Sequence, residues 1–297
     1  MRPEIMALLA ATCWATASTF SVGPTQRLGA IGFSRLRMAF ATLLLWALTL
    51  ASGGWHSLHP SAMGLLAASG LIGIFIGDTA LFACMNRLGP RRSGVLFACH
   101  ALFSALLAWA WLGEVLWGWA LLGSLMLMAG VMIAILWGKR SVESHLWEQT
   151  KGRLAVGVAL GLTAALCQSL ATLMLKPLMT TGIDPIAASA VRTTLALLAH
   201  LALWLSGWKP ARAGGPITLR DAGWVFLGAA IAMVLGMTLI LKALHEGQAG
   251  IVAIFSSVSP IVILPLLWLI YRRRPAFGAW MGASLAITGT ALILSHP

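Results

Sequence analysis

The stretch Ala11-Thr12-Cys13-Trp14-Ala15-Thr16-Ala17 decides the fold, because it recurs in the second half of the chain as Ala165-Leu166-Cys167-Gln168-Ser169-Leu170-Ala171. The two copies lie roughly 155 residues apart, and the same offset aligns Arg37 with Arg192. Further along, Leu88-Gly89 corresponds to Glu246-Gly247. Self-similarity at a fixed offset is the signature of an internal repeat, so the sequence predicts two related halves.

The composition indicates that the bilayer is the solvent of this chain. Hydrophobic residues make up 59% of the 297 residues and charged residues 9%, whereas soluble domains carry about 25% charged residues. Apolar stretches of about 20 residues match a hydrocarbon core about 30 Å thick. Ten such stretches are expected, at residues 4–22, 31–51, 61–86, 92–112, 117–137, 153–176, 184–206, 220–244, 248–271 and 276–295. The sequence therefore predicts an all-α polytopic membrane protein.

Ten spans and an internal repeat predict two halves of five helices each. We expect a first repeat at residues 1–138, a cytoplasmic linker at residues 139–152 and a second repeat at residues 153–297. An odd number of spans per repeat places the second copy in the opposite orientation, so the repeats are inverted. Folds of this kind bind their substrates between the repeats, near the middle of the membrane.

The net charge of +12 is explained by orientation in a membrane, and no nucleic-acid partner is expected. Most lysines and arginines lie in the odd-numbered loops, which the positive-inside rule places in the cytoplasm. We therefore expect a multi-pass protein of the bacterial inner membrane with both termini in the periplasm. The first span lacks a small-residue cleavage site and is expected to be retained. The four cysteines lie within spans and lack CxxC spacing, so no disulfide, metal or other cofactor is expected.

The motifs at the end of each predicted repeat resemble those of a known family. Leu88-Gly89 and Ser93 precede a span that ends in Leu112-Gly113-Glu114, and the next span carries Gly123 and Gly130, which recur as Gly282 and Gly289. Each pair lies on one helix face, so we expect these four glycines to serve helix packing, with helix bending as the alternative. This order resembles the EamA domain of the drug/metabolite transporter superfamily, and the resemblance covers nearly the whole chain. It implies a ten-helix exporter of small metabolites, with a cavity lined mostly by helices 1, 3, 4, 6, 8 and 9. Exporters of amino acids, including aromatic ones, look nearest.

Two departures from the family pattern limit what the resemblance implies. His100-Ala101 stands where many relatives have Glu-Pro, although Ser259-Pro260 keeps the proline in the second half. The second copy also has Tyr271-Arg272-Arg273-Arg274 in place of a terminal glutamate. Coupling chemistry based on a family glutamate therefore cannot be transferred to this chain.

Ionisable side chains inside the hydrocarbon are functional candidates because they are costly to bury. Asp78 in the third span and His100 in the fourth are expected at a similar depth, roughly 12 Å from the cytoplasmic end. If these two residues are neighbours, they could share a proton or hold a substrate ammonium, which makes both of them candidates for proton coupling. A structural pair, or separate hydrogen-bonded packing roles, is the alternative.

A semi-polar stripe is expected on helices 1 and 6. Trp14 and Ser18 are four residues apart, as are Gln168 and Thr172, and this spacing places each pair on one helix face. Phe82 lies one turn after the candidate aspartate and would extend an aromatic lining. Trp14 lies in the middle of its span, unlike a tryptophan that anchors the membrane interface. Core packing is the alternative for this stripe.

Arg192 and its counterpart Arg37 lie inside their spans and could receive a substrate carboxylate, although snorkelling or pairing with helix-end carbonyls explains them equally well. In the ninth span, Pro260 is expected to act as a hinge and to free backbone carbonyls near mid-membrane. Three hydroxyls beside the proline complete the predicted substrate-binding set: Ser256, Ser257 and Ser259.

The sequence favours a secondary transporter that exports small metabolites, amino acids above all, by alternating access. It contains no Walker-type ATP-binding motif. A multidrug or cation antiporter is the first alternative, but the first span carries an acidic residue only at its edge, Glu4. A membrane-embedded enzyme is the second alternative, and no clustered catalytic residues indicate one. The expected partners are a small-molecule substrate and membrane lipid, and a monomer is expected to suffice.

Overall fold

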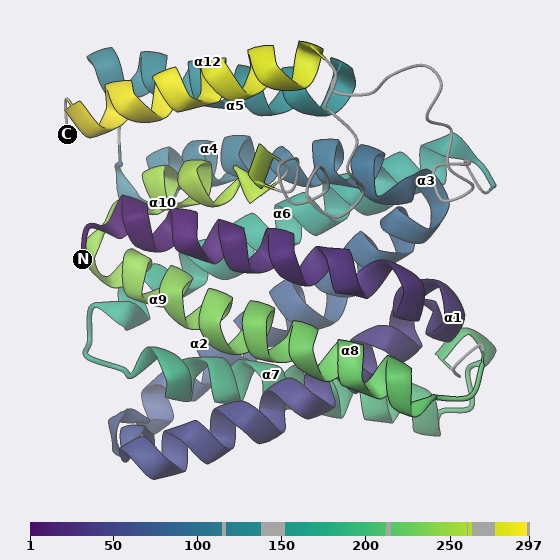
Figure 1. Ribbon diagram of the computed structural model, residues 1–297. Helices are drawn as coiled ribbons and strands as arrows, with labels where there is room; N and C mark the ends of the chain where they lie inside the picture. The colour runs from purple at the N-terminus through teal and green to yellow at the C-terminus, as the bar shows by residue number, and fades with distance from the viewer. Residues whose placement is uncertain (115–116, 138–151, 212–214, 260, 263–276, 296–297) are drawn as a thin grey trace.

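The computed structural model describes residues 1–114, 117–137, 152–211, 215–259, 261–262 and 277–295 (Figure 1). These residues contain helices and no β-strand. Within the described residues, six stretches are long and apolar enough to cross a membrane: Pro3–Ser52, Pro60–Gly89, Arg92–Leu112, Leu154–Met179, Pro185–Leu205 and Leu219–Glu246. Shorter apolar helices cover Gly118–Ile133 and Trp280–Ile293. The prediction of an all-α membrane protein is therefore confirmed.

The described elements fall into two groups, one before residue 138 and one after residue 152. The elements before residue 138 are α1 (Pro3–Ser52), η1 (Gly54–Ser57), α2 (Pro60–Ser69), η2 (Gly70–Asp78), α3 (Thr79–Ala98), α4 (His100–Leu112) and α5 (Gly118–Trp137). The elements after residue 152 are α6 (Leu154–Met179), α7 (Pro185–Leu205), η4 (Lys209–Ala211), α8 (Leu219–Ala229), η5 (Ala230–Gly236), α9 (Met237–Glu246), α10 (Ala249–Ser256) and α12 (Phe277–Ser295).

Two glycines divide stretches that are too long for a single crossing. The 50 residues of α1 would extend about 75 Å as one helix, more than twice the hydrocarbon thickness. Gly29 (φ 73°, ψ 163°) and Gly89 (φ 83°, ψ 162°) adopt conformations that are open essentially to glycine alone. Figure 1 shows α1 crossing the molecule and then turning back. The loop expected between residues 22 and 31 is therefore wrong, because the chain stays helical up to a single-residue turn.

Two of the predicted spans are interrupted. Cys99 forms a turn between α3 and α4, so the span expected at residues 92–112 is not one continuous helix. The helix α10 ends at Ser256, and Ser257 is its cap. The two breaks lie about 158 residues apart, close to the offset of the sequence repeat. The predicted hinge at Pro260, and residues 263–271 of the expected ninth span, lie outside the described residues.

Two segments, η2 and η5, are π-helices in the middle of longer helical stretches. A π-helix pairs each amide with the carbonyl five residues earlier, and such widened turns are frequent at functional sites. The carbonyl of Ala232 in η5 accepts a hydrogen bond from the indole nitrogen of Trp14, at 3.1 Å. The widened turns therefore offer backbone groups to neighbouring helices, which the hydrophobic pattern did not predict.

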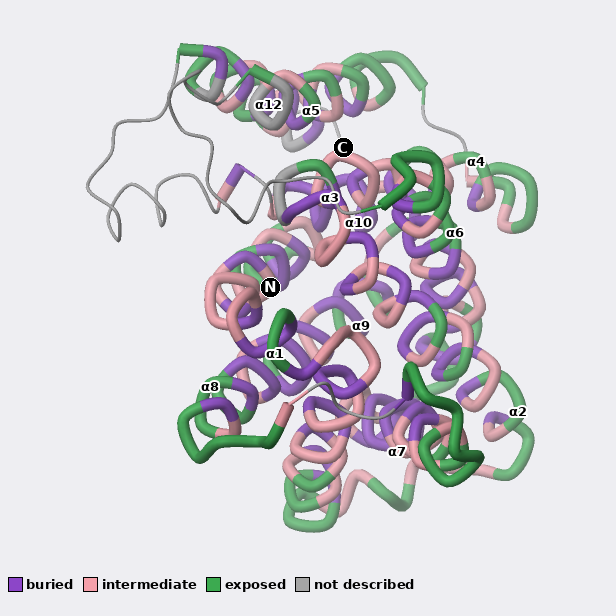
Figure 2. The backbone as a smooth tube through the Cα atoms, turned by 90° about the vertical axis from the view of Figure 1, so that its right-hand side faces the viewer, coloured by how far each residue is buried: buried purple, intermediate pink, exposed green. Residues whose placement is uncertain are grey.

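The helices lie side by side in layers (Figure 1). The pair α5 and α12 forms one outer layer, and α7, α2 and the second part of α1 lie on the opposite side of the molecule. The first part of α1 lies between them with α6 and α9. Figure 2 shows that buried residues lie on the inner sides of the helices. The main hydrophobic cluster accordingly joins residues of α1, α6, α7, α9 and α10.

Glycines bring α5 and α12 into backbone contact. A Cβ atom added to Gly130 would lie 2.5 Å from the backbone oxygen of Gly282, and one added to Gly123 would lie 2.7 Å from that of Gly289. Small residues allow such approach where lipid supplies no hydrophobic drive for association. The packing role predicted for these four glycines is therefore consistent with the contacts they make.

We expect Gly130→Ala to destabilise the protein by about 1 to 3 kcal/mol, because the added methyl group overpacks the α5–α12 contact. Gly64→Ala is the matched control, since Gly64 is also helical and has no atom within 4 Å of an added Cβ. Thermal unfolding of both variants in detergent measures the effect. Equal melting temperatures for the two variants would contradict the close-packed interface.

Candidate functional site

A buried ion pair joins the second part of α1 to the end of η2. The guanidinium of Arg37 donates to the carboxylate of Asp78. Arg37 is 8% exposed and the Asp78 side chain 18%. Removing either charge from water is costly, so each group requires the other as its partner. The pair therefore fixes the position of both helices.

Aromatic rings cover the guanidinium of Arg37. Its central carbon lies 4.6 Å from the ring centroid of Phe82 and 5.9 Å from that of Phe33. The two rings meet edge to face, with centroids 4.7 Å apart. A cation placed over an aromatic face is attracted by the ring quadrupole. Phe82, predicted as part of an aromatic lining, thus lies beside the buried charges.

Arg192 of α7 is a second buried guanidinium close to the first. It is 2% exposed, its Nη1 lies 3.1 Å from the sulfur of Met237, and its Nε has no hydrogen-bond partner. A Cβ added to Gly73 of η2 would lie 3.5 Å from its Nη2. The Asp78 carboxylate lies within its electrostatic range. We call these three residues the arginine cluster: Arg37, Asp78 and Arg192. Its one carboxylate bonds to Arg37.

His200 of α7 lies beside the arginine cluster and was missed by the sequence reasoning. Its Nε2 is 3.4 Å from the hydroxyl of Thr79, its Nδ1 has no partner, and its ring contacts Phe75 with centroids 4.8 Å apart. It is fully buried. The rule that selected His100, a histidine within an apolar span, applied equally to His200 and could have found it.

Asp78 pairs with Arg37, and proton sharing between Asp78 and His100 stays a prediction. His100 begins α4 and is 3% exposed. Its ring lies against Phe97, with centroids 5.1 Å apart, and its carbonyl accepts a hydrogen bond of 2.8 Å from Ser169. Equal depth along two helices did not decide which residue Asp78 contacts, since the arginine was also within reach.

The residues of the predicted semi-polar stripe on α1 and α6 bond to different partners. The Trp14 indole lies against η5, where a Cβ added to Gly236 would lie 2.8 Å from its nitrogen. Ser18 returns its hydroxyl to the carbonyl of Ala15 in its own helix, at 2.7 Å. On α6, the Gln168 amide donates to the hydroxyl of the buried Thr172 at 3.3 Å. Gln168 and Thr172 thus satisfy each other along one face, as their spacing predicted.

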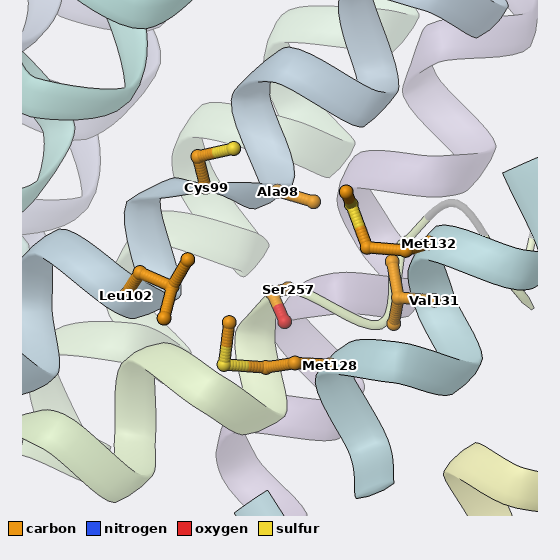
Figure 3. Close-up of a pocket in the computed structure, with 7 residues that line it drawn as sticks. All are labelled: Ala98, Cys99, Leu102, Met128, Val131, Met132 and Ser257. Atoms are coloured by element: carbon orange, nitrogen blue, oxygen red, sulfur yellow. The ribbon is translucent and has the colours of Figure 1, made fainter. Parts of the chain in front are cut away.

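The predicted serines lie around the end of α10. Ser256 and Ser257 are buried, Ser259 is half-buried, and each donates to a carbonyl three residues earlier. Ser257 also lines a pocket with six other residues: Ala98, Cys99, Leu102, Met128, Val131 and Met132 (Figure 3). This cavity measures about 50 Å³, whereas small-molecule sites measure about 300 to 1,000 Å³. The pocket is therefore too small for a metabolite in this conformation.

A second polar cluster holds the turn between α9 and α10. The carboxylate of Glu114, which follows α4, accepts hydrogen bonds of 3.0 and 3.1 Å from the first two amides of α10. The ammonium of Lys176 on α6 donates to the carbonyls of Leu244, at 2.7 Å, and Gly247. We call Glu114 and Lys176 the turn clamp. In the described part of the chain, no three His, Cys, Asp or Glu side chains are grouped to hold a metal.

The geometry is that of a helical membrane protein with buried charges, and the comparison with protein families decides its identity. The model of the EamA-like transporter family matches residues 1–136 and, a second time, residues 155–295. The chain belongs to the EamA-like transporter family. It is therefore a multi-pass membrane transporter of small solutes, and the resemblance derived from its motifs is confirmed.

Two further comparisons agree with this family assignment. The uncharacterized transporter YetK of Bacillus subtilis (strain 168) is 25% identical over 284 residues, which cover 95% of this chain and 84% of YetK. A crystal structure of a protein has a TM-score of 0.76 at 17% identity and covers 98% of this chain and 96% of that one. This likeness shows a shared fold alone.

We expect Asp78→Asn to destabilise this EamA-family protein by about 3 to 5 kcal/mol, because the substitution leaves buried guanidiniums without a counter-charge. Denaturant unfolding in detergent measures the loss. The double variant Arg37→Met with Asp78→Leu removes both charges of the pair. It should be more stable than Arg37→Met alone or Asp78→Leu alone. Additive losses in this double-mutant cycle would show that the two side chains are not energetically coupled.

Proposed function

We propose that this transporter exports amino acids, in particular those with apolar or aromatic side chains, by alternating access across the inner membrane. The arginine cluster carries the proposal. It places two guanidiniums and one carboxylate among apolar helices, so its net charge favours an anionic group of the solute. The apolar side chain of such an amino acid would find aromatic residues on neighbouring helices: Trp14 and Phe33 of α1, and Phe82 of α3.

The proposed architecture is ten spans in two inverted repeats, with the odd-numbered loops in the cytoplasm. The family model matches twice, at residues 1–136 and 155–295. Both halves also carry a π-helix, η2 or η5, and a helix break, at Cys99 or Ser257. Interrupted helices near mid-membrane form the substrate sites of inverted-repeat transporters. These matched interruptions support a path between the two halves.

Cation antiport is less well supported than amino acid export. A cation site requires a carboxylate free to hold the ligand, but Asp78 is paired with Arg37 and lies near Arg192. Asp221 forms an ion pair with Arg27 in the same way. A cationic solute would therefore meet a positive field at the arginine cluster. No observation favours an enzyme over a transporter.

Counterflow into proteoliposomes tests the proposed function. Vesicles loaded with L-phenylalanine should accumulate labelled L-phenylalanine, while cationic dyes should not exchange. Movement of the dyes in place of any amino acid would overturn the proposal in favour of the antiporter. The same assay across pH tests proton coupling, because Asp78→Asn or His100→Gln would flatten a pH dependence that passes through that residue.

The turn clamp is proposed to close one end of the path. It joins α4 and α6 to the α9–α10 turn and lies at the end of the molecule where α1 begins, since a Cβ added to Gly247 would contact Pro3. At the opposite end, Asn86 donates to the carbonyl of Thr25 at 3.2 Å. Alternating access requires the contacts at one end to open while those at the other end hold.

We expect Glu114→Gln to open the turn clamp, because the neutral amide replaces the charged acceptor of the α10 amides. Hydrogen exchange of residues 249 and 250 should accelerate by about tenfold, the scale of a lost helix cap. Counterflow should slow, because the open state becomes overpopulated. The control is Glu246→Gln, which alters an exposed glutamate near the same turn. Equal exchange in the two variants would rule out the capping role.

A further inference from the structure

The π-helices η2 and η5 pack on the repeated stretch of the opposite half in the same way. Gly77 of η2 packs on Cys167, and Gly236 of η5 packs on Cys13, with an added Cβ lying 3.1 and 3.3 Å from the respective cysteine Cβ. Cys13 and Cys167 are counterparts in the repeated stretch. Gly77 and Gly236 therefore occupy matched positions, and so do the residues that follow them, Asp78 and Met237.

This correspondence exposes a difference in charge. Arg37 donates to the carboxylate of Asp78, while Arg192 places its Nη1 3.1 Å from the sulfur of Met237. A thioether is a weak acceptor and carries no charge. The first half thus supplies its arginine with a counter-ion, and the matched position in the second half does not.

The imbalance leaves Arg192 in an unusual state for a buried group. The residue is 2% exposed, and no ion pair to it is formed within the described residues. Its Nε, like that of Arg37, has no hydrogen-bond partner. Asp78 is near, but its hydrogen bond goes to Arg37. A charge buried in a membrane protein without a partner is costly and marks a functional site.

We propose that Arg192 binds the carboxylate of the transported solute, at the place where Met237 stands in for the missing aspartate. The inference rests on the proposed function and names its substrate class: a carboxylate-bearing amino acid with an apolar side chain. Guanidinium binds carboxylate bidentately, which supplies both charge and orientation.

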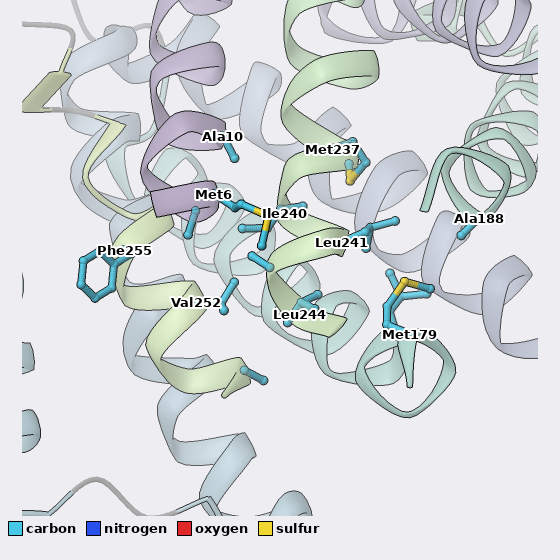
Figure 4. Close-up of a cluster of buried hydrophobic side chains, with 14 of the residues drawn as sticks. Met6, Ala10, Met179, Ala188, Met237, Ile240, Leu241, Leu244, Val252 and Phe255 are labelled. Carbon is cyan, nitrogen blue, oxygen red and sulfur yellow. The ribbon is translucent and has the colours of Figure 1, made fainter. Parts of the chain in front are cut away.

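The surroundings of Met237 suit the replacement of its thioether by a solute carboxylate beside Arg192. Met237 begins α9 beside Ile240 and Leu241 in the buried cluster (Figure 4). Methionine is unbranched and adapts its shape, so a change of side-chain rotamer is the simplest way for its thioether to leave Arg192. Gly236, the preceding residue, lies against the indole of Trp14. Movement of Met237 therefore opens Arg192 toward an aromatic and apolar surface.

Binding measurements on the full-length protein in detergent test the proposal with named probes. L-phenylalanine should stabilise the wild type against heat, and phenethylamine, which lacks the carboxylate, should not. Arg192→Met should weaken L-phenylalanine binding by at least tenfold, and Arg192→Lys should bind with intermediate strength. Equal stabilisation by phenethylamine and L-phenylalanine, or no binding of L-phenylalanine to the wild type, would overturn the proposal.

The most specific variant is Met237→Asp, which supplies the missing carboxylate from the protein. It should compete with the solute and weaken L-phenylalanine binding by at least tenfold. The matched Met237→Leu variant removes the thioether without adding charge and measures the contribution of packing. Wild-type affinity in Met237→Asp would contradict a carboxylate site at Arg192.

Melting temperatures measured without ligand show whether a variant fails to bind because it has lost the site or because it is poorly folded. Met237→Asp should lower the melting temperature much less when Arg192 is present than in an Arg192→Met background, because only the arginine can compensate the new charge. Equal losses in both backgrounds would show that Arg192 does not need an anion.

The counterflow assay separates this proposal from the proposed function. If Arg192→Met exchanges L-phenylalanine as the wild type does, the Arg192 site is wrong and the proposed export stands. If L-phenylalanine binds through Arg192 but no amino acid crosses the membrane, the site stands and the proposed export fails.

Discussion

A guanidinium buried among apolar helices requires a counter-charge, and the ion pair between Arg37 and Asp78 meets this requirement where α1, η2 and α7 come together. Around it, η2 approaches α7 so closely that a Cβ added to Gly70 would lie 2.5 Å from the backbone oxygen of Arg192. The second arginine is therefore held against the same π-helix without a carboxylate of its own. The π-helix η2 therefore carries the carboxylate of the ion pair and also makes the close backbone contact with α7.

The interruptions of the helices lie where other elements of the protein cover them. A helix in lipid satisfies its own backbone, and irregular backbone is tolerated only where protein or a path covers it. The breaks at Cys99 and Ser257 both line the small pocket between α4, α5 and α10, and the π-helix η5 offers a carbonyl to Trp14. The helix α5 lines this pocket and also carries the glycine contacts with α12, so tight packing and interrupted helices meet at α5.

Much of the fold could be predicted because span length and apolar composition are imposed by the bilayer. The glycine pattern at Gly123 and Gly130 predicted a packing role because close approach requires missing side chains. The π-helices could not be predicted, since they depend on neighbours and leave the hydrophobic period unchanged. Depth along a helix could not identify Arg37 as the partner of Asp78, because the choice of partner depends on helix rotation. The clamp by Glu114 likewise required two segments about 135 residues apart to be placed together.

The central claim is that Arg192 lacks a counter-ion because the solute provides it. A structure of the protein with bound L-phenylalanine tests this claim most directly. The account predicts that the carboxylate of the amino acid lies within about 3 Å of the Arg192 guanidinium, in charge-assisted hydrogen bonds, and that the Met237 side chain has moved away. An amino acid bound elsewhere, with Arg192 still against the sulfur of Met237, would contradict it.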